Sequence, residues 1–445
     1  MTHVLYPTTN LQSQEQLKLV TGRGVYVYDD RGKRYLEGMA GLWCVSLGYG
    51  NEELIEIATK QYRDLSFGHL FGGKTHQPAI DLAGKLADMV DIPDAKVFFG
   101  NSGSDANDTL LKCIRYFNQS QGRATKRKII ARDRAYHGVT MASSTLTGLA
   151  INHTHFDLPF DDLKILRAEA PHFYRNSLPG ETQAQFCQRL VTQLEEMLQA
   201  EGPDTIAAFV AEPINGAGGV IVPPAGYFQA VQQLLNKHDI LFLDDEVICA
   251  FGRTGADFGA TTFQIKPDCM SLAKGLSSAY FPISASVISG EIYSQIEAAS
   301  RELGLFGHGY TYSGHPVGCA LALKTLEIYE RDNLYQHAAT LGAYLHQKLD
   351  EKVGAFACVG EIRGMGLIAA IQFVANRDTK TFFDNHRFAQ LCQSACEQNG
   401  LILRALSDNS LAICPPLIID KEQIDELVDI LTESIDEVMR YHFIE

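Results

Sequence analysis

Lys274 is the residue of this sequence best suited to nucleophilic chemistry on a carbonyl group. It stands in the uncharged stretch 269–278 (CMSLAKGLSS) and follows a probable strand. In apolar surroundings a lysine loses part of its preference for the charged form, and the neutral amine can form a Schiff base with an aldehyde. The alternative is a lysine at a strand end that simply reaches solvent.

Two other segments carry groups that an aromatic phosphate compound would need. Asp245 ends the apolar run 240–245 (ILFLDD), where a carboxylate beside a pocket can pair with a ring cation; a helix cap or a metal ligand is the alternative. The loop 101–104 (NSGS) lies between a strand pattern and a helix pattern, so its donors, Ser102 among them, suit a phosphate, although an ordinary N-cap explains the loop as well. With Lys274 these are the parts needed to hold pyridoxal phosphate.

A competing phosphate site is suggested by the segment 68–75 (GHLFGGKT), which matches the nucleotide-loop pattern G-x-x-x-x-G-K-[ST]. The segment 241–246 (LFLDDE) would be its magnesium strand. Such a loop must follow a buried strand and open a helix. The residues before it, 51–67, have apolar side chains at helical spacing. We therefore predict a surface loop between two helices. The rival hypothesis is a nucleotide hydrolase, which would bind ATP or GTP with magnesium and would lack the yellow colour of a pyridoxal phosphate protein.

Strand and helix patterns alternate through the middle of the chain. Buried strands are predicted at 96–100, 205–213 and 240–247, and helices at 104–119 and 226–239. This alternation predicts an α/β fold with a largely parallel sheet. The segment 24–41 predicts a short hairpin that turns at 30–32, and the chain after residue 320 is mostly helical. We expect the two ends to combine into a second domain.

Composition and net charge limit the classes of molecule that this protein is expected to bind. The 445 residues include 46% hydrophobic side chains, enough for a large core and about two domains. The formal net charge is −15 and no basic cluster exceeds KRK at 126–128, so we expect no binding to nucleic acid or to a membrane. The N-terminus has no signal-peptide pattern, and we expect a cytoplasmic protein. The ten cysteines have neither disulfide-framework nor metal-ligand spacing, so no metal is expected.

The sequence resembles the class III aminotransferases, which are pyridoxal-phosphate enzymes of fold type I, and within them the ω-transaminases that use pyruvate as amino acceptor. The resemblance runs nearly from end to end. It rests on these motifs, in this order: YLEGMAGLWCVSLGYG, FFGNSGSDANDTLLK, RDRAYHGVT, VAEPINGAGGVIVPPAGYF, LDDEVICAFGRTG, SLAKGLSSAYFPISA, HGYTYSGHPVGCALAL and LILRALSDNSLAICPP.

The resemblance implies both an architecture and an activity. The architecture is a large domain, 56–325, that binds the cofactor on a mostly parallel sheet, and a small α+β domain built from 1–55 and 326–445. The chain is expected to form a homodimer, or a dimer of dimers, with shared active sites. The activity is a ping-pong transfer of an amino group from an amine or ω-amino acid to pyruvate or a similar α-keto acid. An aminomutase or a decarboxylase on the same scaffold is the rival, because pocket residues decide the reaction.

The resemblance assigns four residues to the cofactor ring. Lys274 carries the cofactor aldehyde and moves the proton during the reaction. Asp245 pairs with the protonated pyridine nitrogen, which keeps the ring able to accept electrons. Val247 and Tyr136 pack against opposite faces of the ring.

A second group is assigned to the cofactor phosphate and its surroundings. Gly103 and Ser104 hold the phosphate together with Thr311 of the partner subunit. His137 and Glu212 lie in the surrounding shell. By the same resemblance, segment 68–75 lies near the dimer interface, where its glycines allow close backbone approach.

Substrate recognition is assigned to Trp43, which lines the pocket with Tyr136, and to Arg404, which meets the substrate carboxylate and swings aside for apolar amines. From the sequence alone, an arginine tied to a nearby acid of the polar turn 408–410 is the alternative. Asp105 and Tyr310 depart from the family pattern, as does 277–285 (SSAYFPISA), and these departures leave the preferred amino donor open.

Overall fold

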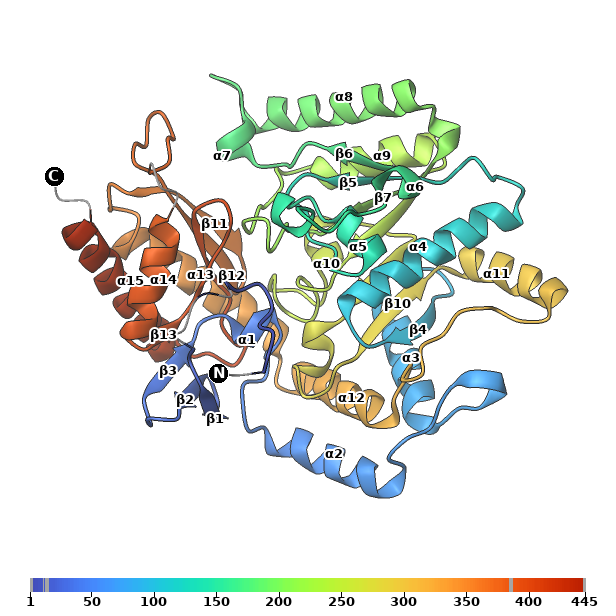
Figure 1. The fold of residues 1–445 in the computed structure, drawn as a ribbon, viewed down its shortest axis with the longest axis horizontal. Helices are drawn as coiled ribbons and strands as arrows, with labels where there is room; N and C mark the ends of the chain where they lie inside the picture. Colours follow the sequence, from blue (N-terminus) through green and yellow to red (C-terminus); the bar gives the residue numbers. More distant parts are fainter. Residues whose placement is uncertain (1–2, 11, 13–15, 384–386, 443–445) are drawn as a thin grey trace.

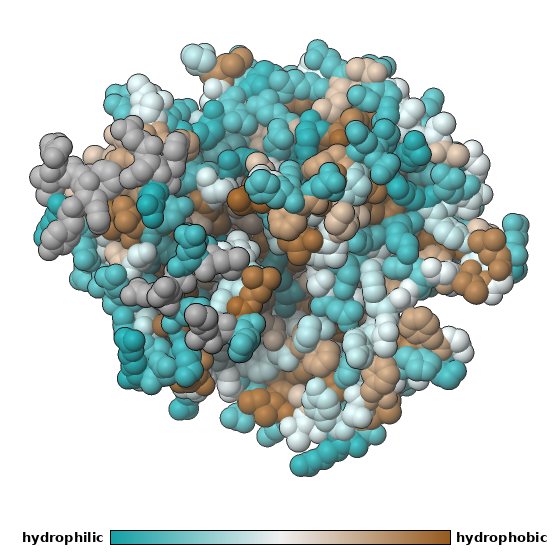
Figure 2. All heavy atoms as spheres, viewed as in Figure 1, coloured by the Kyte–Doolittle hydropathy of each residue, from teal (hydrophilic) through white to brown (hydrophobic). Residues whose placement is uncertain are grey.

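A computed structural model describes residues 3–10, 12, 16–383 and 387–442 (Figure 1). A large α/β part fills the right of Figure 1, and the first strands lie beside the last helices at the left. Hydrophilic residues dominate the face drawn in Figure 2, and hydrophobic ones form separate patches on it. None of the helices in the described ranges combines the length and apolar character needed to cross a membrane.

A seven-stranded sheet forms the centre of the large part, in the order β4-β10-β9-β8-β7-β5-β6. Strand β10 runs antiparallel to both its neighbours, and the pairs from β9 to β6 are parallel. The predicted α/β fold with a mostly parallel sheet is therefore confirmed. The strands are β4 (Lys96–Gly100), β5 (Lys128–Arg132), β6 (Ile165–Ala168), β7 (Ile206–Ala211), β8 (Leu241–Asp245), β9 (Cys269–Leu272) and β10 (Ser284–Ile288).

Helices cover both faces of this sheet, because parallel strands that are apolar on both sides must be buried on both sides. Val210 and Leu243 belong to the buried cluster that also contains Ile114 of α4, whereas Phe209 and Phe242 belong to the cluster on the opposite face. The helices of this part are α4 (Gly103–Ser120), α5 (Met141–Leu146), α6 (Phe160–Leu163), α7 (Phe173–Asn176), α8 (Gln183–Glu201), α9 (Tyr227–Lys237), α10 (Gly259–Phe263) and α11 (Gly290–Leu303), with 3₁₀ helices η2 (Ala150–Asn152), η3 (Pro203–Thr205) and η4 (Lys274–Ser277).

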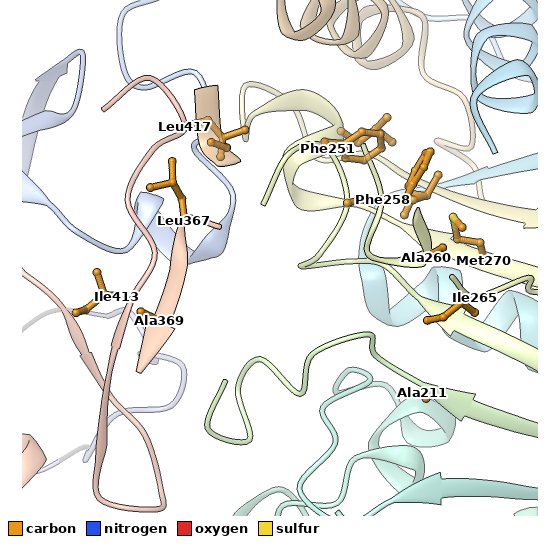
Figure 3. Packing of buried hydrophobic residues seen from close by; sticks show 14 of the residues in the cluster. Ala211, Phe251, Phe258, Ala260, Ile265, Met270, Leu367, Ala369, Ile413 and Leu417 are labelled. Atoms are coloured by element: carbon orange, nitrogen blue, oxygen red, sulfur yellow. The ribbon is translucent and has the colours of Figure 1, made fainter. Parts of the chain in front are cut away.

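A second, antiparallel sheet lies in the C-terminal part, in the order β11-β12-β15-β14. Leu367, Ile413 and Leu417 of this part belong to the same buried cluster as Phe251 and Phe258 of the large part (Figure 3). The two parts therefore share one apolar core. The elements are α12 (Pro316–Arg331), α13 (Leu334–Lys352), β11 (Val359–Met365), β12 (Ile368–Phe373), α14 (Phe388–Gln398), β14 (Arg404–Ala405), β15 (Ser410–Ile413) and α15 (Lys421–His442).

The third sheet joins the two ends of the chain. Strands β1 (Leu19–Arg23), β2 (Tyr26–Asp29) and β3 (Arg34–Glu37) form the predicted hairpin region, and the turn at Gly32 has a φ of 81°. Strand β13 (Leu401–Ile402) adds to β3 in parallel, with Leu401 opposite Leu36. The domain boundaries at 55 and 325 remain a prediction.

The segment 68–75 lies between two helices, as predicted. It follows α2 (Glu52–Asp64), contains the short 3₁₀ helix η1 (Phe71–Gly73) and leads into α3 (Gln77–Met89). Gly72 and Gly73 have φ values of 60° and 77°, which favour glycine. Because α2 and no strand precedes this loop, the structural requirement of a nucleotide phosphate loop is not met.

Candidate active site

A cavity of about 400 Å³ lies where parallel strands β7, β8 and β9 end. The carboxyl ends of parallel strands are where α/β sheets bind their ligands. The cavity brings together nine of the residues predicted from the sequence, and they come from five separate segments of the chain. These residues are Ser102, Gly103, Ser104, Tyr136, His137, Glu212, Asp245, Val247 and Lys274.

Asp245 is the last residue of β8, and its carboxylate is held from several sides. Oδ2 lies 2.7 Å from Nδ1 of His137 and accepts a hydrogen bond of 2.8 Å from the side-chain amide of Asn107. Oδ1 accepts the amide N–H of Val247 at 3.1 Å. Burial by itself would raise the pKa of Asp245, but these hydrogen bonds lower it below its usual value. Asp245 is therefore a buried carboxylate that stays ionised.

Lys274 follows β9 and is buried in the cavity wall. Its backbone is left-handed, with a φ of 46°, which is disfavoured for a residue that has a Cβ. With this conformation the extended backbone of β9 ends and the 3₁₀ helix η4 begins. Burial lowers the pKa of Lys274, while Asp245, Cys44 and Glu212 oppose the shift. Lys274 is thus a buried amine, as expected from the sequence, and its role as the reactive amine stays a prediction.

The N-terminus of α4 forms the anion-binding side of the cavity. Asp105 accepts hydrogen bonds from the amides of Asn101 and Ser102, and Ser102 Oγ accepts the Asp105 amide at 3.2 Å. This capping box leaves the next two amides, those of Gly103 and Ser104, without a partner inside the helix. The Asp in place of Glu at position 105 therefore preserves the loop.

Glycine is required at position 103 because the helix N-terminus approaches β8 closely. A Cβ there would lie 2.9 Å from Cγ1 of Val247. Ser104 Oγ accepts the amide of Val139 at 3.1 Å, which ties the next loop to the helix. The predicted partners of a cofactor phosphate and of its ring are thus in direct proximity.

Glu212 shapes the cavity through the backbone. Its two carboxyl oxygens accept the amides of Tyr136 and Gly216, each at 3.0 Å. Burial raises its pKa, and His137 partly offsets the effect. One side chain thereby fixes the two loops that follow β5 and β7.

Asn107 is a site residue that the sequence reasoning missed. Its side-chain amide donates both to Asp245 and, at 2.7 Å, to the carbonyl oxygen of His137. Because Asn107 lies one helical turn after Gly103, the two share a face of α4. That spacing, combined with the expected phosphate at the helix start, was the signal available in the sequence.

Trp43 does not line the cavity within the described part of the chain. Its side chain is 3% exposed and belongs to a buried cluster with Met39, Ile248 and Leu406. Of these, Ile248 does line the cavity. Trp43 therefore lies behind the cavity wall of the single chain, and its predicted direct substrate contact stays a prediction.

Arg404 is in β14, which pairs with β15, and it is half-buried. Burial lowers the pKa of Arg404, and Tyr136 nearby opposes the shift. Among the residues that the structure describes, none forms a hydrogen bond or an ion pair with the Arg404 side chain. The acid suggested as its partner, Asp408, is instead bound by Arg363 at 2.9 Å and by Arg134 at 3.3 Å.

Thr311 lies in an exposed turn before α12. It is not among the described residues that line the cavity of its own chain. A role in cofactor binding for this residue therefore requires a second subunit.

The chain matches the family model for class III aminotransferases over residues 9–435. Gamma aminobutyrate transaminase 1 of Solanum lycopersicum, a mitochondrial protein, is 44% identical over 428 residues, which cover 95% of this chain and 82% of that protein. Its counterpart in Oryza sativa subsp. japonica is 45% identical over 435 residues, which cover 96% and 83%.

Solved structures show the same fold. The ω-transaminase of Pseudomonas jessenii in complex with PMP aligns with a TM-score of 0.96 at 45% identity, covering 99% of this chain and 97% of that one. A transaminase crystallised with L-alanine aligns with a TM-score of 0.93 at 46% identity, covering 95% and 99%.

The cofactor of class III aminotransferases is pyridoxal phosphate, and the cavity fits this group. Asp245 supplies a buried anion for a ring cation, Lys274 supplies a buried amine, and the first amides of α4 supply donors for a phosphate. The rival nucleotide hydrolase is excluded by the family match and by the helix before segment 68–75. The chain belongs to the class III aminotransferases.

Proposed function

We propose that this aminotransferase moves an amino group from an amine or an ω-amino acid to pyruvate or a similar α-keto acid. The observation that carries the proposal is Arg404, a half-buried arginine near Tyr136 whose side chain has no acidic partner in the described chain. Leaving a cation buried without an anion is costly, so such a site favours an anionic ligand. The carboxylate of a keto acid supplies that anion.

The position of Arg404 also suits a ligand that is present in only half of the cycle. It lies in a strand of two residues, Arg404–Ala405, directly before a polar turn. The turn is anchored through Asp408, whose partners are Arg363, Arg134 and Gln372. Arg404 is therefore free to turn toward a carboxylate and away from an apolar amine, while its backbone stays fixed.

Lys274 and Asp245 are proposed to carry the chemistry. When bound, pyridoxal phosphate supplies an aldehyde that exchanges amines and a ring that stores electrons. The Lys274 amine, whose pKa burial lowers, takes the proton from the substrate carbon and returns it as general base and acid. Asp245 stays ionised and keeps the ring nitrogen protonated.

The remaining cavity residues are proposed to bind and orient the cofactor. The Gly103 and Ser104 amides, with Ser102 and the positive end of α4, hold the phosphate. Tyr136 and Val247 enclose the ring. His137 and Glu212 hold Asp245 and the loop of Tyr136, respectively.

We further propose a homodimer in which Thr311 of the partner subunit completes the phosphate site. The support is an apolar surface beside this turn, where the ring centroids of Phe67 and Tyr312 lie 5.8 Å apart. Exposed apolar patches of this kind mark subunit interfaces. Exposed large hydrophobic residues in these parts of the chain are Ile55, Tyr62, Leu65, Phe67, Phe71, Ile80 and Tyr312.

We propose the same division into a large domain, 56–325, and a small one built from 1–55 and 326–445. The parallel pairing of β3 with β13 supports it. All ten cysteines are free thiols, which supports a reducing compartment such as the cytoplasm.

The decisive experiment is a panel of donors run with pyruvate as acceptor and scored for alanine. The panel contains 4-aminobutyrate, because the relatives named above act on it by their names, and also β-alanine, taurine, a polyamine and an aryl-alkyl amine. A parallel series uses 2-oxoglutarate and is scored for glutamate. Alanine formation with at least one donor is expected. Glutamate without any alanine would overturn pyruvate as the acceptor and leave the aminotransferase family intact.

A further inference from the structure

Glu37, the last residue of β3, is a buried carboxyl group with no assigned role in the reaction. It is 2% exposed. Oε1 accepts the amide of Met39 at 3.0 Å, Oε2 accepts the hydroxyl of Tyr49 at 3.2 Å, and the carboxyl also accepts the amide of Gly41. All three donors lie within the next twelve residues, so Glu37 organises the segment that follows it.

That segment carries Trp43 and has an unusual backbone. Ala40, Gly41 and Trp43 have φ values of 45°, 66° and 66°. Residues with a Cβ disfavour this left-handed region, so the turn persists only where surrounding contacts fix it. The Glu37 carboxyl accepts two amides of this turn.

Glu37 and the residue after it, Gly38, also contact strand β13, which precedes Arg404. Ile402 is opposite Glu37 in the β3–β13 pair, and the Gly38 amide donates to the Ile402 carbonyl at 2.9 Å. Ile402 precedes Arg404 by two residues. A Cβ on Gly38 would lie 2.6 Å from Leu403, so the two segments are in tight contact.

The packing of Trp43 couples this left-handed turn to the cavity wall. It packs in one buried cluster with Leu406, which follows β14, and with Ile248, which lines the cavity. A shift of the turn that carries Trp43 would therefore move the cavity wall and the neighbourhood of Arg404 together.

We propose that Glu37 is a positioning residue for amine specificity: its carboxyl oxygens fix the left-handed turn of Trp43, while its backbone pairs with the strand that precedes Arg404. Glu37 is not among the described residues that line the cavity, and it acts through Trp43. The inference rests on the proposed role of Trp43 in the substrate pocket. Three titratable side chains lie close to the carboxyl: Tyr49, Cys44 and Cys414.

The test is a double-mutant cycle on the holoenzyme. The variants are Glu37→Leu, Trp43→Ala and the double variant, and the quantity measured is the ratio of kcat/KM for 1-phenylethylamine to kcat/KM for β-alanine. Glu37→Leu and Trp43→Ala are each expected to raise this ratio at least about fivefold, mainly through KM. The double variant is expected to equal Trp43→Ala alone, because contacting residues are not additive.

Two conservative variants separate positioning from general stability. Glu37→Gln keeps an acceptor oxygen for the backbone amides of the turn, so it should retain the wild-type ratio. Glu37→Asp keeps the charge but shortens the reach, so it should give an intermediate ratio; it replaces Glu37→Leu if that variant yields no folded holoenzyme. The absorbance of the bound cofactor should be the same in all of them.

The outcomes that overturn the two claims differ. If the effects of Glu37→Leu and Trp43→Ala multiply in the double variant, or if Glu37→Gln fails to restore the ratio, Glu37 does not act through the turn. If Trp43→Ala leaves the ratio unchanged, the proposed pocket role of Trp43 is wrong, and the inference falls with it.

Discussion

His137 and Asp245 form a buried pair in which Nδ1 of the ring lies 2.7 Å from Oδ2 of the carboxylate. The His137 side chain has no exposed surface, and that of Asp245 is 3% exposed. Asn107 reaches the same oxygen and also holds the backbone carbonyl of His137. The carboxylate therefore has one fixed orientation and a lowered pKa before any ligand arrives.

Replacing Asp245 with Asn should slow both half-reactions. Breaking a buried ion pair costs roughly 3–5 kcal/mol, and about 3 kcal/mol in the barrier corresponds to about a hundredfold. Single-turnover absorbance changes measure each half separately. Asp244→Asn is the matched control, since Asp244 is the neighbouring buried carboxyl of β8 and its pKa is raised by burial and by Glu246. An Asp245→Asn enzyme as fast as this control would show that Asp245 is not the pyridine partner.

Borohydride reduction should attach the cofactor covalently to Lys274. The motivation is that burial lowers the pKa of this amine and that it lies in the cavity with Asp245. The purified protein should be yellow before reduction. Peptide mapping locates the label, and Lys274→Ala provides the unlabelled control. A label on any other lysine would refute the assignment.

Removing Arg404 should affect the two halves of the cycle unequally. Arg404→Ala deletes a charge-assisted contact to the keto acid, for which about 1.5–3 kcal/mol is typical. This corresponds to a loss of roughly 10- to 150-fold in kcat/KM for pyruvate, and an amine without a carboxylate should change severalfold at most. Arg301→Ala, on the exposed side of α11, is the control and should change neither half. Equal losses in both halves would mean that Arg404 is structural.

The free energy of unfolding of the protein should depend on pH through the titration of Glu37. Burial raises the pKa of Glu37 from 4.5 to about 7, against the effect of its hydrogen bonds. The folded chain therefore holds a proton that the unfolded chain loses above pH 4.5, so this contribution to stability is lost as the pH rises from 4.5 to about 7. Relative to Glu37→Gln, the wild type should lose about 3 kcal/mol across this window. Urea unfolding of both proteins at several pH values measures the difference, and a difference independent of pH would contradict the pKa.

Mixed dimers test whether Thr311 acts across the interface. Lys274→Ala and Thr311→Glu should each abolish or strongly reduce activity as pure dimers, the second because its charge repels the phosphate. In a mixed dimer, one site keeps Lys274 of its own chain and Thr311 of the partner subunit. Activity should then return to about half of wild type, since one of two sites is intact. A mixed dimer without activity would place Thr311 in the site of its own chain, and a fully active pure Thr311→Glu dimer would place it outside any site.

Much of the fold and the cavity could be predicted from local patterns. Strands β4, β7 and β8 appear as apolar runs, and α4 and α9 as periodic ones, because burial on both faces of a parallel sheet leaves a clear signal. Polar residues at the ends of such strands meet at one edge of the sheet. This is why Lys274, Asp245 and the loop 101–104 were brought together correctly.

The features that could not be predicted from the sequence depend on contacts between distant segments. A strand of two residues such as β13 has no periodicity, and its pairing with β3 is decided by the tertiary fold. The role of Asn107 depends on Asp245, which lies 138 residues further along the chain. Likewise, Trp43 is separated from Leu406 in sequence and joined to it only by the packing of three sheets.

The parallel pair of β3 and β13 also has a consequence for the newborn chain on the ribosome. Strand β13 can pair with β3 only after Leu401, about 365 residues after Leu36, has been synthesised. At about 5–20 residues per second, synthesis of that stretch takes roughly 20–70 s. During this interval Val27 and Leu36, which are buried in the finished protein, lack the cover supplied by the last residues. During translation the segment of β2 and β3 is thus an apolar surface that chaperones can protect until β13 has been made.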